Sequence, residues 1–502
     1  MSRTTTKLSF GEKCGYAAGD ASANFVFQIL LIFQAGFYTD VMGIGAAALG
    51  TLLLLVRFSD AITDPLMGMI ADRTKTRWGK FRPWVLWSAL PFAFLFWATF
   101  TVPAGLSGNG RLIYAAATYT LLMMAYTVNN VPYSALMGVM TGDSSERTSL
   151  SSFRFVAGIG AAFVVQGFTL PLVGKFGGGD DAKGWSLAIG VFALVSIVFF
   201  VITFLTARER IQPPPGQKMD IKQDFADVRK NVPWLAMFAL TLFVFITLAL
   251  RGGSFYYYFT YYVNSQAIES FLDGLGLMAT PETLASAGLG FKVLDLFGLI
   301  VTPGADPSKV GFSLFNMTGS LVNILGILAA KPLADRFGKM AVFVVGLGGA
   351  TLVQFSFIAL DPTQVGTMFF LTFLSSAAYG PTIPLLWAMM ADVADYSEWK
   401  TGRRSTGFVF SGIVFALKAG LGLGGALSGW LLAAYGYSAE TARTPEVLDG
   451  IRMMTSVYSA IPFALGVVAV AYYPITKALN IQIAEELERR RQSVQQQSVP
   501  AS

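Results

Sequence analysis

The sequence predicts an all-α membrane protein with about twelve transmembrane helices in two similar halves. Apolar runs near twenty residues long recur along the whole chain, and about twenty residues is the length that a helix needs to cross a bilayer. Of the 502 residues, 54% are hydrophobic and only 13% are charged, whereas about 25% of the residues of soluble domains are charged. This composition excludes an ordinary soluble protein.

Twelve apolar runs are the predicted spans. They lie near residues 10–39, 45–70, 83–102, 112–138, 149–173, 185–206, 234–263, 310–331, 340–360, 365–391, 406–436 and 451–474. Basic residues gather after the second, sixth, eighth and tenth runs and again in the tail. Because basic loops remain in the cytoplasm, both termini are expected there. Most of the basic residues behind the net charge of +6 lie in these loops, so the charge does not indicate binding to nucleic acid. We expect the protein to contact a lipid bilayer and no nucleic acid.

A repeated motif supports the division into halves. Ala71-Asp72-Arg73 follows the second run and Ala334-Asp335-Arg336 follows the eighth, each with Gly-Lys a few residues later. Two parallel six-helix halves are typical of the major facilitator fold. We therefore expect an N-terminal bundle at 1–207, a central cytoplasmic loop at 208–233, a C-terminal bundle at 234–475 with an extended outer loop at 264–309, and a cytoplasmic tail at 476–502.

The outer loop 264–309 contains an apolar stretch, Leu289–Val301, that is too short to cross a membrane and that carries Lys292 and Asp295. This pattern is compatible with an external cap or surface helix, and also with a disordered insertion.

The chain has no histidine and one cysteine, Cys14, so an internal disulfide is excluded and carboxylates must carry any proton or cation chemistry. No cluster of metal-ligating residues and no Ser-based dyad stands out, so we do not expect an enzyme. Ser2 to Lys13 is polar and the next run carries Asp20, which does not fit a cleavable signal peptide.

Charged residues inside the second span are the first candidate site. Arg57, Asp60 and Asp64 are spaced i, i+3 and i+7 and therefore share a helix face. Two carboxylates one turn apart repel each other when both are ionised, so the pair favours a bound cation or a proton. The alternative is an internal salt bridge with Arg57.

Polar stripes at helical spacing mark two further spans: Asp20, Asn24 and Gln28 in the first, and Thr127, Asn130 and Ser134 in the fourth. Such stripes line water or sugar rather than lipid. The alternatives are hydrogen bonds between helices and, in the fourth span, a packing seam around a kink at Pro132.

Three basic residues also lie within spans, where charge is costly and therefore points to function. Lys418 is the only charge within the eleventh run and is expected to serve as counter-ion for the acids of the first two spans, unless it is neutral. Arg154 lies near the cytoplasmic end of the fifth span, where it contacts the pathway or snorkels to the interface. Arg251 precedes Gly252-Gly253, which indicates a broken helix near the pathway. The aromatic residues that follow, within 256–262, are expected to form mainly an interfacial belt; the alternative is that one or two of them stack on a sugar face.

Longer motifs surround these residues. They are Arg57-Phe58-Ser59-Asp60-Ala61-Ile62-Thr63-Asp64-Pro65, Arg77-Trp78-Gly79-Lys80-Phe81-Arg82-Pro83, Gly15-Tyr16 with Asp20, Tyr38-Thr39-Asp40-Val41, Tyr126-Thr127 with Pro132, Ala391-Asp392-Val393-Ala394-Asp395-Tyr396, and Lys418-Ala419-Gly420. Together they resemble the signature of the glycoside–pentoside–hexuronide:cation symporters, in particular the melibiose permease branch, over nearly the whole chain except the outer loop and the tail.

The resemblance implies roles for the residues that match. These are cation-binding acids for Asp60 and Asp64, a cation-site hydroxyl for Thr127, an acid bonding galactoside hydroxyls for Asp20, a sugar-site arginine for Arg154, and a lysine between both sites for Lys418. The chain departs from the melibiose permease pattern where Gly19 replaces a lysine, Thr63 an asparagine, Asn130 a second sugar-binding aspartate and Ser134 a tryptophan. These departures leave the sugar, the anomer and the cation open.

From the residues and the resemblance we expect symport of a sugar or glycoside with Na⁺ or H⁺ by alternating access, with no cofactor beyond the coupling ion, by a monomer in the cytoplasmic (inner) membrane. The expected substrate contacts are Asp20, Asn24, Asn130, Arg154 and Lys418, and the expected cation ligands are Asp60, Asp64, Thr127 and Thr63.

A gate is expected where the tenth span ends beside basic loops. Asp392 and Asp395 are predicted to pair there with Arg336, Arg403 or Arg404 when the cytoplasmic side is closed. The alternative function is that of a lysolipid transporter of the related branch, which needs an apolar lateral cleft instead of hydroxyl-binding groups.

Overall fold

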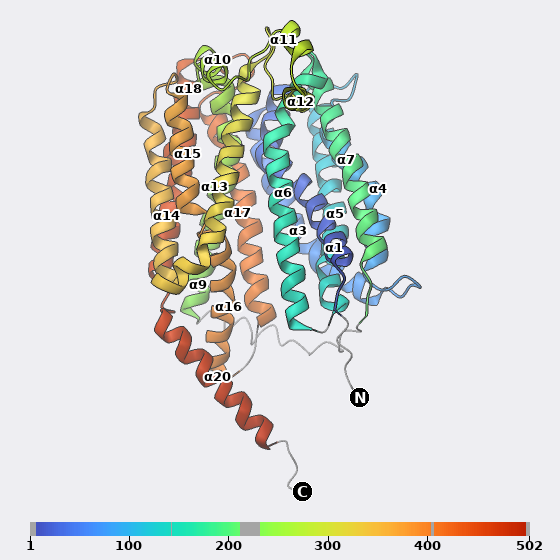
Figure 1. Cartoon of the computed structure of the whole chain (residues 1–502), viewed down its shortest axis with the longest axis vertical. Helices are drawn as coiled ribbons and strands as arrows, with labels where there is room; N and C mark the ends of the chain where they lie inside the picture. Colours follow the sequence, from blue (N-terminus) through green and yellow to red (C-terminus); the bar gives the residue numbers. More distant parts are fainter. Residues whose placement is uncertain (1–6, 142, 211–230, 403–405, 498–502) are drawn as a thin grey trace.

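The computed structural model describes residues 7–141, 143–210, 231–402 and 406–497, and helices dominate it (Figure 1). The helices of the first half are α1 (Phe10–Ile32), α2 (Gln34–Gly36), the π-helical turn η1 (Phe37–Val41), α3 (Ala46–Arg73), α4 (Arg82–Thr99), α5 (Asn109–Met140), α6 (Ser144–Gly177) and α7 (Asp181–Thr206). Those after the central loop are α9 (Val232–Tyr257), η2 (Tyr258–Tyr262), α10 (Ser265–Gly274), α11 (Pro281–Ser286), α12 (Leu289–Leu296), α13 (Pro307–Phe337), α14 (Lys339–Ser356), η3 (Phe357–Ala359), α15 (Val365–Tyr379), α16 (Thr382–Thr401), α17 (Thr406–Ala434), α18 (Pro445–Met453), η4 (Met454–Tyr458), α19 (Ser459–Ala471) and α20 (Lys477–Gln497).

Most of these helices are long and apolar enough to cross a membrane. Within the described ranges there are ten such helices, and the pair formed by Phe10–Ile32 and Gln34–Val41, which bends by 57°, makes eleven. The 18-residue helix α4 falls outside that group, but it packs along α5 and α7 within the same bundle. The all-α membrane fold expected from the sequence is therefore confirmed, with α4 as the marginal span.

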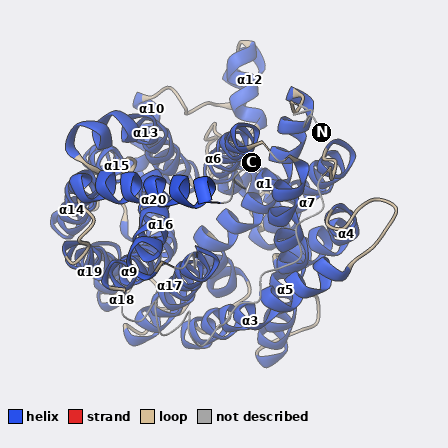
Figure 2. Cartoon of the chain, turned by 90° about the horizontal axis from the view of Figure 1, so that it is seen from below, coloured by secondary structure: helices blue, strands red, loops and turns tan. Residues whose placement is uncertain are grey.

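The transmembrane helices form two bundles, seen from below in Figure 2, with α1 to α7 in one and α9 to α19 in the other. The bundles meet where α3 packs on α17 and α6 packs on α13. Glycines bring α3 and α17 close together, since a Cβ atom on Gly429 would lie 2.5 Å from the backbone nitrogen of Gly50. Small residues permit this close approach of helices in membranes.

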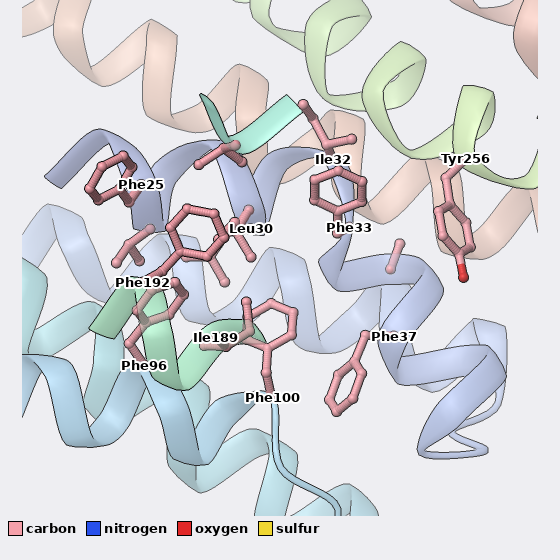
Figure 3. Close-up of a cluster of buried hydrophobic side chains, with 14 of the residues drawn as sticks. Phe25, Leu30, Ile32, Phe33, Phe37, Phe96, Phe100, Ile189, Phe192 and Tyr256 are labelled. Carbon is pink, nitrogen blue, oxygen red and sulfur yellow. The ribbon is translucent and has the colours of Figure 1, made fainter. Parts of the chain in front are cut away.

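The buried apolar residues form two clusters, and their positions distinguish the two ends of the molecule. In Figure 1 the upper end carries α10 to α12 and the lower end carries both termini. One cluster fills the first bundle and continues into the upper part of the second, whereas the other lies within the lower part of the second bundle. Figure 3 shows part of the first cluster, and the ring of Phe33 in the first half lies 6.1 Å from that of Phe312 in the second. The apolar core therefore joins the bundles at the upper end.

The outer loop 264–309 contains helices and covers the upper end. This arrangement agrees with a cap or surface helix and not with a disordered insertion. Its helices α10 to α12 are described throughout, and the loop contacts the first bundle. Lys175 of α6 lies 2.9 Å from the Asp295 carboxylate, and the rings of Phe168 and Phe297 are 4.7 Å apart.

The tail contains a helix that the sequence pattern did not lead us to expect. Helix α20 extends from Lys477 to Gln497 at the lower end. It is tied to α16 because Trp399 Nε1 donates to Glu486 Oε2 over 2.5 Å.

Candidate functional site

A cluster of four charged groups joins the two bundles at mid-depth. Asp60 and Asp64 lie one turn apart on α3, and Lys418 of α17 donates to Asp64 Oδ2. Lys418 Nζ also lies 3.8 Å from Asp60 Oδ2, and Arg57 Nη1 lies 3.8 Å from the same oxygen. The structure thus brings together the acids of the second span and the lysine of the eleventh, and the group as a whole carries no net charge.

Several oxygen atoms in and beside this cluster have no hydrogen-bond donor among the described residues. Both carboxylate oxygens of Asp60 and the hydroxyl of Thr63 are buried and without a hydrogen-bond partner among the described residues. Thr127 of α5 donates to Asp64 Oδ1 over 2.9 Å. Buried polar groups are nearly always paired, so unpaired oxygens are compatible with an absent ligand. A set made only of oxygen atoms suits a hard cation.

A second ion pair lies on the first bundle alone. Arg154 Nε of α6 donates to Asp20 Oδ1 over 2.6 Å, and Asn24 Nδ2 donates to Asp20 Oδ2 over 3.1 Å. The Arg154 guanidinium lies 5.3 Å from the centroid of the Tyr133 ring, which stacks on Tyr16 at 4.6 Å. Arg154 therefore points inward instead of snorkelling, and the pair offers both an acid and a guanidinium beside an aromatic ring.

Asn130, the other expected substrate contact on the first bundle, is half-buried on α5. It accepts a hydrogen bond of 3.3 Å from Ser134, one turn along the helix. Within the described chain it makes no hydrogen bond to Asp20 or Arg154. Lys418, which was also expected to contact substrate, pairs with the acids of α3 and with neither Asp20 nor Asn130.

A polar cavity of about 150 Å³ lies between the bundles above Asp20. Gln28 of α1 accepts from Gln166 of α6 over 3.2 Å, and Ser320 of α13 donates to Gln166 over 2.5 Å. The remaining polar groups in its wall are Arg251, Asn316, Asn323, Thr372 and Ser376. The sequence analysis missed the wall from the second bundle, although positions 316, 320 and 323 have the i, i+4, i+7 spacing that places polar residues on one face of a helix.

At the lower end, Asp392 pairs in this conformation with a residue outside the expected gate, which was predicted for the state closed on the cytoplasmic side. Both of its oxygens accept from Lys339 Nζ, at 2.8 and 2.7 Å, and Asn480 donates to Oδ1 over 3.2 Å. Arg336 instead lies over the ring of Phe337. The reason is the turn at Gly338, with φ of +86°, which starts α14 at Lys339 where α14 packs on α16.

Both partners of Asp392, Lys339 of α14 and Asn480 of α20, belong to the second half, so this contact does not join the bundles in this conformation. Asp395 is half-buried on α16. Arg403 and Arg404 lie outside the described residues, so their part in the expected gate stays a prediction.

At the upper end, a carboxylate of the first bundle is held by hydroxyls of the second. Tyr437 and Tyr261 donate to the Asp40 oxygens Oδ1 and Oδ2 over 2.5 and 3.0 Å. Thr39 bonds to Tyr257 Oη over 2.8 Å. Tyr257 and Tyr261 belong to the run that was expected to form mainly a belt at the lipid interface. Tyr257 is instead fully buried, and its hydroxyl has Thr39 as partner.

Comparison with known proteins places these features in context. The chain matches the family described as MFS/sugar transport protein over residues 15–287 and 302–477. It is 35% identical to the inner membrane symporter YicJ of Escherichia coli, over 98% of this chain and 97% of that protein. It is 34% identical to the putative glycoside/cation symporter YagG of the same organism (99% and 98% covered) and 30% identical to the isoprimeverose transporter of Lactiplantibacillus pentosus (96% and 92% covered).

The crystal structure of the nucleoside transporter NupG has a similar fold. Its TM-score is 0.56 with 13% sequence identity, over 92% of this chain and 99% of that one. At this identity the similarity concerns the major facilitator fold alone.

Proposed function

Because the chain belongs to the MFS/sugar transport protein family, and is thus a multi-pass membrane transporter and not an enzyme, we propose that it carries a sugar or glycoside together with Na⁺ or H⁺. We place it in the cytoplasmic membrane, with the basic loops and both termini in the cytoplasm. The relatives named as symporters and as an isoprimeverose transporter support this proposal.

The observation that carries the proposal is the ionic contact between Lys418 of the second bundle and Asp64 and Asp60 of the first. Charges at this depth are costly unless they are paired or face a cavity. A cation that binds the two acids takes the place of Lys418. Cation binding therefore weakens the contact of Lys418 with Asp60 and Asp64, which holds the two bundles together. In this way, occupancy of the cation site affects the movement of one bundle relative to the other.

The coupling ion has a set of ligands available in this arrangement. Asp60, Asp64 and Thr127 supply carboxylate and hydroxyl oxygens, and Thr63 adds a further hydroxyl on the same side of α3. Either Na⁺ coordination or protonation of one carboxylate neutralises the repulsion between the acids. The sugar binds apart from this cluster, at Asp20, Asn24 and Arg154, and towards the cavity above them.

The conformation corresponds to a carrier closed on the outside. With the termini in the cytoplasm, the upper end is the outer face, and there the bundles are joined by Asp40 with Tyr437 and by Lys175 with Asp295. Alternating access requires these contacts to open when substrate enters from outside.

The test is uptake by proteoliposomes with an imposed Na⁺ or H⁺ gradient, preceded by counterflow with a panel of labelled glycosides to find a substrate. We expect the Asp60→Asn, Asp64→Asn double variant to lose uphill accumulation while downhill exchange survives. The matched control is Asp72→Asn on the same helix, where the side chain is 65% exposed, and it should accumulate sugar like the parent. Full concentrative uptake by the double variant would refute the coupling role.

The lysolipid alternative receives no support from the cavity between the bundles. Its wall presents amides, hydroxyls and one guanidinium from both bundles, and such groups suit a polyhydroxylated ligand better than an acyl chain. Competition of uptake by lysolipids measures the alternative directly.

A further inference from the structure

We infer that helix α12 of the outer loop docks on the lipid surface at the upper end of the molecule, with one apolar side immersed in the bilayer. This goes beyond the proposed function, because it depends on neither the sugar nor the coupling ion. The family match covers residues 15–287 and 302–477 and therefore leaves out α12 (Leu289–Leu296), so the helix is a feature of this chain that the family match does not describe.

Helix α12 carries an apolar stripe that the described residues leave uncovered. Leu289, Val293 and Leu296 are spaced i, i+4 and i+7 and therefore share one side of the helix. They are 81%, 44% and 63% exposed, whereas Leu294 and Asp295 on the opposite side are half-buried against the protein. A single exposed leucine is ordinary, but a contiguous apolar stripe indicates contact with another surface.

The longest helix of the same loop shows the contrast. In α10, Ile268 and Leu272 are fully buried, and the ring of Phe271 lies 4.7 Å from that of Phe369 on α15. No residue of α12 is buried. The described residues thus cover the apolar side of α10 and not that of α12, although both helices belong to the cap.

Contacts with α6 place α12 at the depth where that span reaches the membrane surface. The ring of Phe297, directly after α12, lies 4.7 Å from that of Phe168, and Asp295 pairs with Lys175. Phe168 lies about 13 Å by helical rise below Gly177, the last residue of α6. Helix α12 therefore lies beside the last turns of a membrane span and not above them.

The turn after α12 brings the helix this close to α6. Gly298 has φ of +73°, and a Cβ atom there would lie 2.5 Å from the carbonyl oxygen of Pro171, so the turn requires glycine. Figure 1 shows α12 nearly end-on, and Figure 2 shows it along its length, projecting away from the bundles. The helix thus lies across the ends of the spans, which is the orientation of an interfacial helix.

Lys292 completes the pattern of an interfacial helix. It is exposed and lies one turn before Leu296, at the edge of the apolar stripe. A lysine in this position lays its aliphatic stem along the acyl chains and extends its ammonium group to the lipid phosphates. The apolar stripe with a basic edge therefore fits a phospholipid surface.

The experiment measures the surroundings of the stripe with a nitroxide label on the full-length protein, reconstituted in vesicles of phosphatidylethanolamine and phosphatidylglycerol. In a Cys14→Ser background, Leu296→Cys carries the label, and Glu282→Cys on the exposed side of α11 is the matched control from the same loop. Oxygen concentrates in the bilayer, so we expect it to relax the label at position 296 severalfold more than a water-soluble nickel chelate does. The opposite preference is expected at position 282.

A further variant tests whether the stripe holds the helix in the lipid. Leu289→Asn combined with Val293→Asn should make the label at position 296 accessible to the nickel chelate. Leu275→Asn, which removes a leucine of the same loop that is 54% exposed but lies outside α12, should leave the oxygen preference unchanged. Thermal unfolding shows that each variant is folded before its label is measured.

Three results overturn the inference. Better access of the nickel chelate than of oxygen at position 296 would place the stripe in water. Low access of both reagents would show that protein covers the stripe, and dipolar broadening between labels would then identify a second copy of the chain. An oxygen preference that the double asparagine variant retains would show that the stripe does not anchor the helix. Each of these results leaves the proposed symport untouched, because none of them depends on transport.

Discussion

Tyr437, in the turn that follows α17, donates a hydrogen bond of 2.5 Å to Asp40, the carboxylate at the end of the first span. The turn is built to present this tyrosine. Gly436 has φ of +75°, and the amides of Gly436 and Tyr437 bond back to the carbonyls of Ala433 and Leu432 over 3.0 and 2.9 Å. This is a Schellman ending, and it places a hydroxyl of the second bundle on an acid of the first.

Loss of this contact should favour the outward-open state. Tyr437→Phe removes a hydrogen bond to a charged group, which contributes about 1.5–3 kcal/mol, and so should shift the populations by roughly ten- to a hundred-fold. A Ser134→Cys reporter, in a Cys14→Ser background, should react more slowly with an impermeant maleimide added from the cytoplasmic side. Tyr472→Phe, an exposed position near the lower end, is the control, and an unchanged rate in Tyr437→Phe would contradict the role.

Lys418→Gln should strengthen cation binding and abolish coupling. Without the lysine, Arg57 is the one cation that remains near Asp60 and Asp64 in the described part of the chain, so the cluster becomes anionic. At about 4 Å, a unit charge contributes roughly 4 kcal/mol at an effective dielectric constant of 20, so we expect Na⁺ affinity to rise by at least about tenfold. Calorimetric titration with Na⁺ measures this, with Lys331→Gln on the exposed side of α13 as control. Unchanged or weaker Na⁺ binding, with H⁺-driven uptake retained, would show that Lys418 does not compete with the ion.

Thr63→Asn should raise the Na⁺ dependence of transport. The Thr63 hydroxyl is buried beside the acids and has no hydrogen-bond partner in the described part of the chain, and an amide oxygen is a better neutral ligand for a hard cation. Uptake measured against Na⁺ concentration should be half-maximal at a severalfold lower concentration, whereas Thr63→Val should move it in the opposite direction. Identical Na⁺ curves for both variants would place Thr63 outside the cation site.

Asp20→Ala should weaken sugar binding by about ten- to a hundred-fold and leave cation binding measurable. The change removes the acceptor of the 2.6 Å contact from Arg154, and one lost hydrogen bond to a buried group costs about 1–3 kcal/mol. Calorimetry with the substrate found by counterflow provides the measurement. Glu269→Gln, on the exposed face of α10, serves as control, and unchanged sugar affinity in Asp20→Ala would sink the assignment.

Breaking the contact of Asp392 with Lys339 should destabilise the lower end of the second bundle. Both carboxylate oxygens accept from the ammonium group and Asp392 is 9% exposed, so Asp392→Asn should lower the free energy of unfolding by about 1–3 kcal/mol. Thermal unfolding in detergent detects the loss, and the exchange Asp392→Lys with Lys339→Asp should recover part of it. If Asp392→Asn unfolds like the parent but changes access from both sides, the residue acts in gating alone.

Much of the site was predictable because it depends on local spacing. The i, i+3, i+7 pattern is enough to place Arg57, Asp60 and Asp64 on one face of α3, since helical geometry repeats every 3.6 residues. The same argument puts Asp20, Asn24 and Gln28 on one stripe. Such spacing does not show which helix of the other bundle faces the polar stripe of α1. For this reason the sequence analysis missed Asn316 and Asn323, which lie on the opposite bundle.

The sequence by itself determined the membrane spans, their division into two halves and the presence of polar and charged side chains within the spans. It could do so because the lipid environment restricts the composition of each segment separately. Only the tertiary structure decided which groups meet. Lys418 contacts Asp64 across 354 positions of the chain, Asp392 accepts from Lys339 instead of Arg336, and Arg251 lies over the Phe255 ring with no ion pair to an acid among the described residues. These pairings depend on how α17 packs against α3 and α14 against α16, and helix packing is a property of whole surfaces, which no single segment specifies.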